Sequence, residues 1–365
     1  MAPKRKKAPV KTLNIALQGG GAHGAFTWGV LDRLLEEEDI EIAAISGTSA
    51  GAMNAVVMAD GLVENGRQGA KDELTNFWSE VSGASKMIEP WLMTPFGSMT
   101  KLLGIDYTPV YTIMDAVTRT FSPYEMNPLN INPLRDVLER NIDFARMRAC
   151  EHLRVFVTAT NVETGQPRIF KHEEISVDVL LASACLPSMF QAVEIDGVPY
   201  WDGGYVGNPS IWPLYYNSPS GDVLLVQINP IMRKGTPKKA LDIINRQNEI
   251  SFNSALIAEM RAINFVPQLI DAGKLGEPEY RHVNMHMIAP PEGLHEMTAE
   301  SKMNASWEFF TFLHQIGRNE TEHWLRENKK MIGVDSTLDI AKTFLTKPTR
   351  ASHTGTNVVK KRANA

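Results

Sequence analysis

Two glycine-rich turns, each directly after a short apolar run, constrain the fold of this chain more than any other feature. The first turn, GGGAHG at residues 19–24, follows the apolar run at 13–18, and the second, GTSAG at 47–51, follows the run at 40–46. Helical spacing of apolar residues begins after each turn. This alternation of strands and helices favours an α/β protein with three layers (α/β/α) and a mostly parallel central sheet.

The same patterns extend through most of the remaining sequence. Strands are expected at residues 153–160, 222–228 and 283–288, with a short hairpin partner at 168–170 and a hairpin at 193–201. Helices are expected at residues 25–35, 52–59, 62–82, 132–138, 177–185, 238–266 and 303–330.

Composition excludes several classes of protein. The net charge of -5 over 365 residues gives no global sign of nucleic-acid binding. Two cysteines, Cys150 and Cys185, do not make a disulfide framework, so we expect a cytoplasmic protein. The longest uncharged stretch of interest, residues 42–59, is too rich in small polar residues for a membrane span. The basic ends, residues 1–11 and 346–365, are expected to be disordered tails, with peripheral contact to an anionic membrane as their functional alternative.

Residues 19–24 also match G-x-G-x-x-G, the pattern of a dinucleotide-binding loop. That loop needs an acidic residue near the end of the second strand, and here the second strand ends in Ile45-Ser46-Gly47. The mononucleotide P-loop is excluded because no Gly-Lys-Ser/Thr follows. A nucleotide-binding protein therefore remains only an alternative, and no cofactor is predicted.

The second turn has the G-x-S-x-G pattern of a nucleophile elbow, in which Gly47 and Gly51 allow the tight backbone that exposes Ser49. Because both turns follow parallel strands, they are expected at the same edge of the sheet. There Ser49 would attack an ester carbonyl. The backbone N–H groups of residues 19–21 (Gly19, Gly20 and Gly21) would stabilise the resulting oxyanion.

The general base has two candidates. Asp202 follows a predicted strand and precedes Gly203 and Gly204, which leaves its carboxylate on an open loop. The alternative is an α/β-hydrolase triad that uses a late histidine, His282 or His286. No Asp, Glu and His cluster has the spacing of metal ligands, so no metal is predicted.

In combination, these motifs resemble the signature blocks of the patatin-like phospholipases. The matching blocks are residues 19–24, 47–51 and 202–204, together with SACLPSMF at 183–190. The resemblance implies a patatin-like fold and a Ser49–Asp202 dyad without histidine. It also implies no cofactor and a lipid or other acyl ester as substrate. Gly24 ends the first block as the resemblance requires, but His23 stands where many members have Arg or Lys.

The resemblance covers residues 13–230, so we expect a catalytic domain at 12–230. Residues 231–345 would form a mainly helical extension packed on the same domain. Residues 85–132, rich in Pro, Met and aromatic residues, would form either a lid insertion or a subsidiary core. The oligomeric state, head group and acyl chain length are left open by the sequence.

Overall fold

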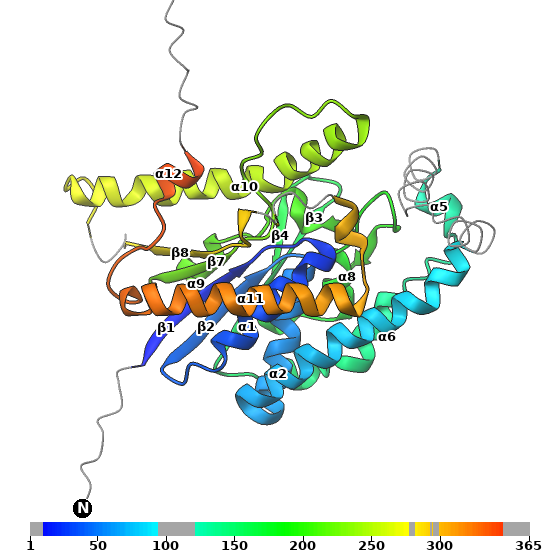
Figure 1. Cartoon of the computed structure of the whole chain (residues 1–365), viewed down its shortest axis with the longest axis horizontal. Coiled ribbons are helices and arrows are strands. Elements are labelled where there is room, and N and C mark those ends of the chain that lie inside the picture. Colours follow the sequence, from blue (N-terminus) through cyan, green and yellow to red (C-terminus); the bar gives the residue numbers. More distant parts are fainter. Residues whose placement is uncertain (1–9, 94–120, 277–281, 293, 295–298, 346–365) are drawn as a thin grey trace, which may run out of the picture.

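The chain folds around a central eight-stranded sheet (Figure 1). This computed structural model describes residues 10–93, 121–276, 282–292, 294 and 299–345. The strand order is β5-β6-β3-β2-β1-β7-β8, and β4 pairs with β3 off this path. The pairs β3–β2, β2–β1, β1–β7 and β7–β8 are parallel, whereas β4 and the β5–β6 hairpin are antiparallel additions beside β3.

The strands lie close to where the sequence predicts them. Their bounds are β1 Lys11–Leu17, β2 Ile40–Gly47, β3 Arg154–Asn161, β4 Pro167–Phe170, β5 Val193–Ile195, β6 Val198–Asp202, β7 Asp222–Val226 and β8 Asn284–Ile288. The β5–β6 turn is made by Asp196 and Gly197, both with positive φ (52° and 77°), as a tight hairpin requires.

The helices cover both faces of the sheet. Their bounds are α1 Gly24–Leu34, α2 Ala50–Met93, α5 Pro123–Met126, α6 Pro133–Asn141, α7 Phe144–Arg148, α8 Val177–Ser183, α9 Trp212–Asn217, α10 Ala240–Asp271, α11 Trp307–Asn328 and α12 Ile340–Phe344. Leu13, Ile15 and Leu17 of β1 point into the larger core beneath α1, α2 and α8, and Ala16 points into the opposite core beneath α9 and α10. The three-layer α/β/α fold with a mostly parallel sheet is therefore confirmed.

One boundary prediction was wrong. The sequence places the break between two helices at residues 60–61, but α2 continues through Gly61, and the break that divides it into two helices lies at Asn65 and Gly66. A Cβ atom at Gly61 would lie 2.5 Å from the Gly69 carbonyl oxygen. Gly61 therefore serves close backbone packing and does not end the helix.

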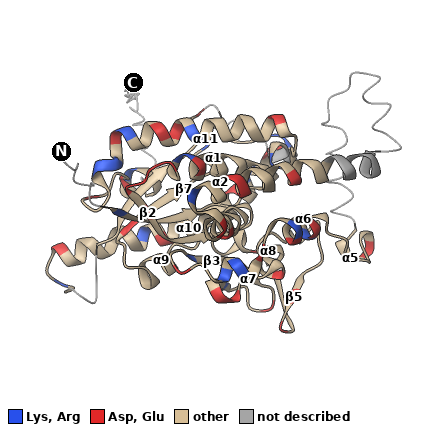
Figure 2. Cartoon of the chain, turned by 90° about the horizontal axis from the view of Figure 1, so that it is seen from below, with Lys and Arg blue, Asp and Glu red and all other residues tan. Residues whose placement is uncertain are grey.

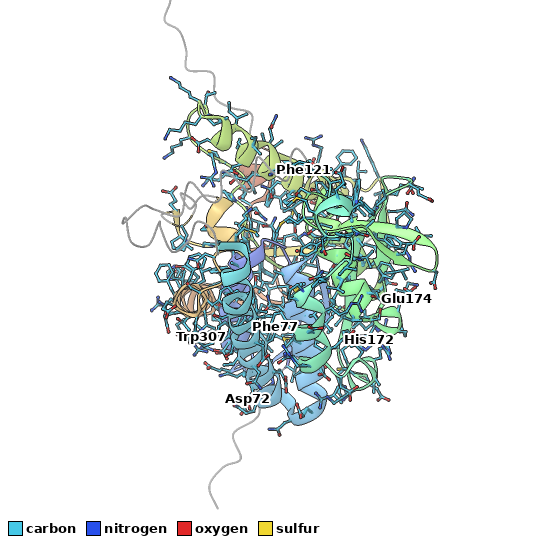
Figure 3. The ribbon with its side chains drawn as sticks, turned by 90° about the vertical axis from the view of Figure 1, so that its right-hand side faces the viewer. Asp72, Phe77, Phe121, His172, Glu174 and Trp307 are labelled. Carbon is cyan, nitrogen blue, oxygen red and sulfur yellow. The ribbon has the colours of Figure 1, made fainter. Side chains whose placement is uncertain are left out.

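Helix α11 packs along α1, beside it in Figures 1 and 2 and seen end-on in Figure 3 near Trp307. The two backbones meet at glycines: a Cβ at Gly29 would lie 2.0 Å from the His314 carbonyl oxygen, and one at Gly317 would lie 2.1 Å from that of Phe26. Glycine is needed at both positions because a side chain would separate the helices.

We expect Gly317→Ala to lower the free energy of unfolding by about 1–3 kcal/mol, the usual cost of overpacking a close contact. Urea unfolding followed by circular dichroism measures the change. Gly83→Ala is the matched control, because Gly83 is helical and exposed, and a Cβ added there would have no neighbour within 4 Å. Helix propensity should make that variant equal to or slightly more stable than the wild type. Equal stability of both variants would contradict the close helix contact.

Some predicted segments lie outside the described residues: nearly all of both basic tails and residues 94–120 of the expected lid insertion. No helix within the described ranges is both long enough and apolar enough to cross a membrane.

Candidate active site

The strand register brings three loops together at one edge of the sheet. Gly47, the last residue of β2, pairs with Val157 of β3 and with Leu17, the last residue of β1. Two residues further along β3, Ala159 pairs with Asp202 at the end of β6. Ser49 lies two residues beyond Gly47, so the register puts the serine turn level with the aspartate turn.

Ser49 occupies the tight turn between β2 and α2 with φ of 54°, a left-handed conformation that is uncommon for a residue with a side chain. Its N–H donates to Ser183 Oγ (2.9 Å), and the Ser183 hydroxyl donates to the Thr158 carbonyl oxygen (2.7 Å). Ser183 is fully buried. The first residue of the 183–190 block therefore holds the serine turn in place, a role that the sequence did not indicate.

The glycines of the turn serve close packing. A Cβ at Gly47 would lie 2.7 Å from the Ala52 nitrogen, and one at Gly51 would lie 2.4 Å from the Leu17 carbonyl oxygen. A Cβ at Gly24, the first residue of α1, would lie 2.7 Å from the Cβ of Ala50. These contacts bring the first turns of α1 and α2 together beneath Ser49.

Asp202 is 4% exposed and accepts a hydrogen bond from the Gly204 N–H (2.6 Å), and its carboxyl lies close enough to the Ser49 side chain for the hydroxyl to favour the ionised form. Burial raises the pKa of the Asp202 carboxyl to about 7, although the Gly204 N–H and the Ser49 hydroxyl act to lower it. Gly203 leaves no room for a side chain, because its Cβ would lie 2.1 Å from the Thr158 carbonyl oxygen. The structure thus joins the two residues that the sequence singled out as nucleophile and base.

The glycine loop lies against Ser49. A Cβ at Gly19 would be 2.8 Å from the Ser49 Cβ. The Gly19 N–H is already engaged, because it donates to Asn208 Oδ1 (2.7 Å). The Gly20 and Gly21 N–H groups have no acceptor in the part of the chain that the structure describes. Of the three predicted oxyanion donors, the N–H groups of Gly20 and Gly21 are therefore free to bind an oxyanion. The Gly19 N–H could bind one only after breaking its hydrogen bond to Asn208.

His23 is uncharged near neutral pH. Burial and the nearby Lys302 lower the pKa of its imidazole to about 3. Its Nε2 atom forms a hydrogen bond with Ser301 Oγ (2.7 Å). His23 therefore does not supply the positive charge that Arg or Lys would bring at its position.

Neither late histidine fits a triad with Ser49. His286 is fully buried, and its two ring nitrogens contact Thr337 Oγ1 (2.9 Å) and Asp222 Oδ1 (3.1 Å). Asp222 is the first residue of β7, so the His286–Asp222 pair lies at the amino ends of the parallel strands, whereas the serine turn lies at their carboxyl ends. His282 is exposed and lies 3.5 Å from Asp271. Both histidines therefore have partners of their own away from the serine turn.

A cavity of about 480 Å³ borders the aspartate strand. Apolar side chains in its lining include Leu181, Cys185, Phe190 and Val193. One lining residue is tied to the site, because the Cys185 carbonyl oxygen accepts from the Asp202 N–H (2.8 Å), whereas neither Asp202 nor Ser49 lines the cavity. Burial and the Asp202 carboxylate raise the pKa of the Cys185 thiol to about 12, which keeps it protonated and a poor nucleophile. Among the described residues no group of three His, Cys, Asp or Glu could hold a metal ion.

Comparison with solved structures gives distant likenesses. VipD from Legionella pneumophila is 14% identical, with 90% of this chain and 72% of that chain covered and a TM-score of 0.41. A chain of the ExoU–SpcU complex of Pseudomonas aeruginosa is 16% identical, with 93% and 58% covered and a TM-score of 0.33. This chain thus spans less than two thirds of the latter.

The search of curated proteins finds no match. The family model described as patatin-like phospholipase matches residues 15–215, more than half of the chain. That range contains the glycine loop, the serine turn and the aspartate turn. The chain therefore belongs to the patatin-like phospholipase family, a family of lipid acyl hydrolases.

Proposed function

We propose that this protein hydrolyses carboxylic esters of lipids through a covalent acyl-enzyme, with Ser49 as nucleophile and Asp202 as general base. The observation that carries the proposal is the placement of the half-buried Ser49 side chain beside the buried Asp202 carboxyl, whose pKa it helps to lower, next to a glycine loop with unoccupied N–H groups. A carboxylate with a pKa near 7 is a far better base for a hydroxyl than an ordinary aspartate.

In the first half of the reaction the Ser49 oxygen attacks the ester carbonyl carbon, and its proton passes to Asp202. The Gly20 and Gly21 N–H groups, at the start of the turn η1 (Gly21–His23) and helix α1, stabilise the negative charge on the carbonyl oxygen. The tetrahedral intermediate then breaks its bond to the alcohol, which leaves with the proton from Asp202. An acyl ester of Ser49 remains.

In the second half a water molecule attacks the acyl-enzyme, and Asp202 accepts one of its protons. The bond to the Ser49 oxygen breaks, the fatty acid leaves, and Asp202 returns the proton to Ser49. The acyl chain would lie against Leu181, Phe190 and Val193, the apolar part of a cavity that is otherwise lined by polar residues and runs beside the β5–β6 hairpin.

The alternative, nucleotide binding at residues 19–24, has less support. A dinucleotide loop lets the pyrophosphate approach bare glycine backbone. Here a Cβ at Gly21 would lie 2.6 Å from the Lys302 carbonyl oxygen, so another segment already covers part of the loop. The second strand ends in Gly47 and is followed by the Ser49 turn, without the acidic residue that would bind ribose.

Labelling with a fluorophosphonate probe, combined with hydrolysis of a panel of phospholipids, lysophospholipids and glycerolipids analysed by mass spectrometry, tests the proposal. We expect one probe adduct on Ser49 and release of fatty acid from at least one lipid class. Equilibrium binding of NAD, NADP and ATP is the parallel measurement. Nucleotide binding without labelling would favour the alternative, and binding to liposomes without labelling or hydrolysis would indicate a non-catalytic lipid-binding protein.

A further inference from the structure

We propose that Lys302, a residue of the C-terminal extension, makes the oxyanion hole a stronger hydrogen-bond donor. Its positive charge acts through Asn229 on the peptide group that joins Gly19 to Gly20. Lys302 and Asn229 both lie outside the range matched by the family model. The inference rests on the proposed function and adds a positioning residue to the same site. Lys302 does not touch the substrate in this proposal; its effect passes through the backbone.

The short turn that carries Lys302, η5 (Ala299–Met303), is fixed to the glycine loop. It appears in Figure 1 as the orange turn before the N-terminal end of α11. The loop residue His23 contacts Ser301 Oγ (2.7 Å), and the Lys302 carbonyl oxygen lies over Gly21, where a Cβ would approach within 2.6 Å. The C-terminal extension is thus in direct contact with the loop that would hold the oxyanion.

A continuous chain of hydrogen bonds leads from the ammonium group to the loop. Lys302 Nζ donates to Asn229 Oδ1 (2.6 Å), and Asn229 Nδ2 donates to the Gly19 carbonyl oxygen (2.8 Å). Asn229 is fully buried, and its own N–H donates to Gln18 Oε1 (2.8 Å), which fixes its orientation.

The Gly19 carbonyl, where this series of hydrogen bonds ends, is chemically coupled to the Gly20 N–H, the proposed oxyanion donor. The Gly19 carbonyl and the Gly20 N–H belong to one peptide group, so electron density drawn toward the carbonyl oxygen makes the N–H more acidic and a stronger donor. Hydrogen bonds in series strengthen one another in this way, most of all where a charge begins the series and little water intervenes. A positive charge on Lys302 would therefore stabilise the oxyanion that the Gly20 N–H receives.

Among the charged groups around it, Lys302 is the one whose charge is expected to change as pH rises above neutral. His23 faces it from η1 and is neutral, with its pKa lowered to about 3. From the loop before α10 and from α10 itself come Arg233 and Glu249, which form an ion pair with each other (2.6 Å). Burial, the largest cause, lowers the pKa of Lys302, and Arg233 adds to the lowering while Glu249 opposes it.

The test compares Lys302→Met, which removes the charge, with Lys302→Arg, which keeps it. For a short p-nitrophenyl ester we expect Lys302→Met to lower kcat about 10- to 100-fold with KM changed less than about threefold. This effect is smaller than the loss of a direct oxyanion donor because it is indirect. Lys302→Arg should recover most of kcat. Lys330→Met is the matched control, because Lys330 is an exposed lysine of the same extension, and it should match the wild type.

The pH dependence of the folded wild type provides a second measurement that does not depend on the Met variant. Wild-type kcat should fall on the alkaline side as Lys302 loses its proton, and the fall should disappear in Lys302→Arg because a guanidinium stays charged. Identical alkaline limbs in the two proteins, or a Lys302→Met variant with wild-type kcat, would overturn the proposal. So would a loss of kcat in Lys302→Met that Lys302→Arg, equally stable in thermal unfolding, fails to restore.

Failure of this inference is distinguishable from failure of the proposed function. A wild-type protein that neither reacts with the fluorophosphonate probe nor hydrolyses any ester would contradict the proposed function itself. A wild type that labels at Ser49 and hydrolyses esters, alongside a fully active Lys302→Met variant, would remove only the role of Lys302.

Discussion

Replacement of Ser49 by alanine is expected to reduce ester hydrolysis by at least about 10³-fold and to abolish labelling by a fluorophosphonate probe. Without its hydroxyl the chain has no atom to form the acyl-enzyme, and the residual rate reflects only the oxyanion donors and substrate binding. Alanine, like serine, carries a Cβ at this position of positive φ, and the N–H bond to Ser183 is retained. Circular dichroism and thermal unfolding should therefore remain close to those of the wild type.

Ser79→Ala is the matched control, because Ser79 is an exposed serine on α2, the helix that follows Ser49. It should keep full activity and full labelling. A folded Ser49→Ala protein that still reacts with the probe at another residue would show that the nucleophile lies elsewhere. The assignment of the serine turn would then be lost together with the mechanism.

The meeting of the two glycine-rich turns at the carboxyl ends of the parallel strands could be predicted, because the sequence signals for it are local. The glycine-rich turns at residues 19–24 and 47–51 follow apolar strands, and parallel strands end at the same edge, so their meeting could be predicted. The place of Asp202 needed the family resemblance. Its strand β6 runs antiparallel to β3, and no local pattern fixes the register that pairs Asp202 with Ala159.

The side chains that bind the backbone of the glycine loop could not be predicted, because these contacts join residues far apart in sequence. Asn208 binds the Gly19 N–H across 189 positions, and Asn229 binds its carbonyl across 210. A single asparagine or lysine in a sequence carries no sign of its partner. The neutral state of His23 is likewise a consequence of burial beneath η5, which only the tertiary structure reveals.

Replacement of Asp202 by asparagine is expected to lower kcat/KM by about 10²–10⁴-fold, the usual contribution of a positioned general base. The wild type should show an acidic limb in kcat/KM with a midpoint near pH 7, because the Asp202 carboxyl, with a pKa of about 7, must be ionised to accept the serine proton. Activity should therefore rise as pH increases through that value. The asparagine variant should lack this limb in its residual activity.

The same substitution should make the protein more stable at alkaline pH. The pKa of Asp202 is about 7 in the folded state against 3.8 for an ordinary aspartate, so the wild type loses stability as pH rises from about 4 through 7. Asparagine does not ionise, and its oxygen can still accept from the Gly204 N–H. The variant should gain up to about 4 kcal/mol at pH 8 and almost nothing at pH 4, at 1.36 kcal/mol per pKa unit.

Urea unfolding of wild type and variant at the two pH values measures this difference, with Asp196→Asn as control. Asp196 is an exposed aspartate in the turn of the same hairpin, and asparagine tolerates its positive φ, so its substitution should leave stability unchanged at both pH values. An Asp202→Asn protein that is inactive yet no more stable at pH 8 than at pH 4 would mean that the carboxylate is solvated. In that case Asp202 would act with an ordinary pKa, and the oxyanion donors would have to supply the greater part of the rate.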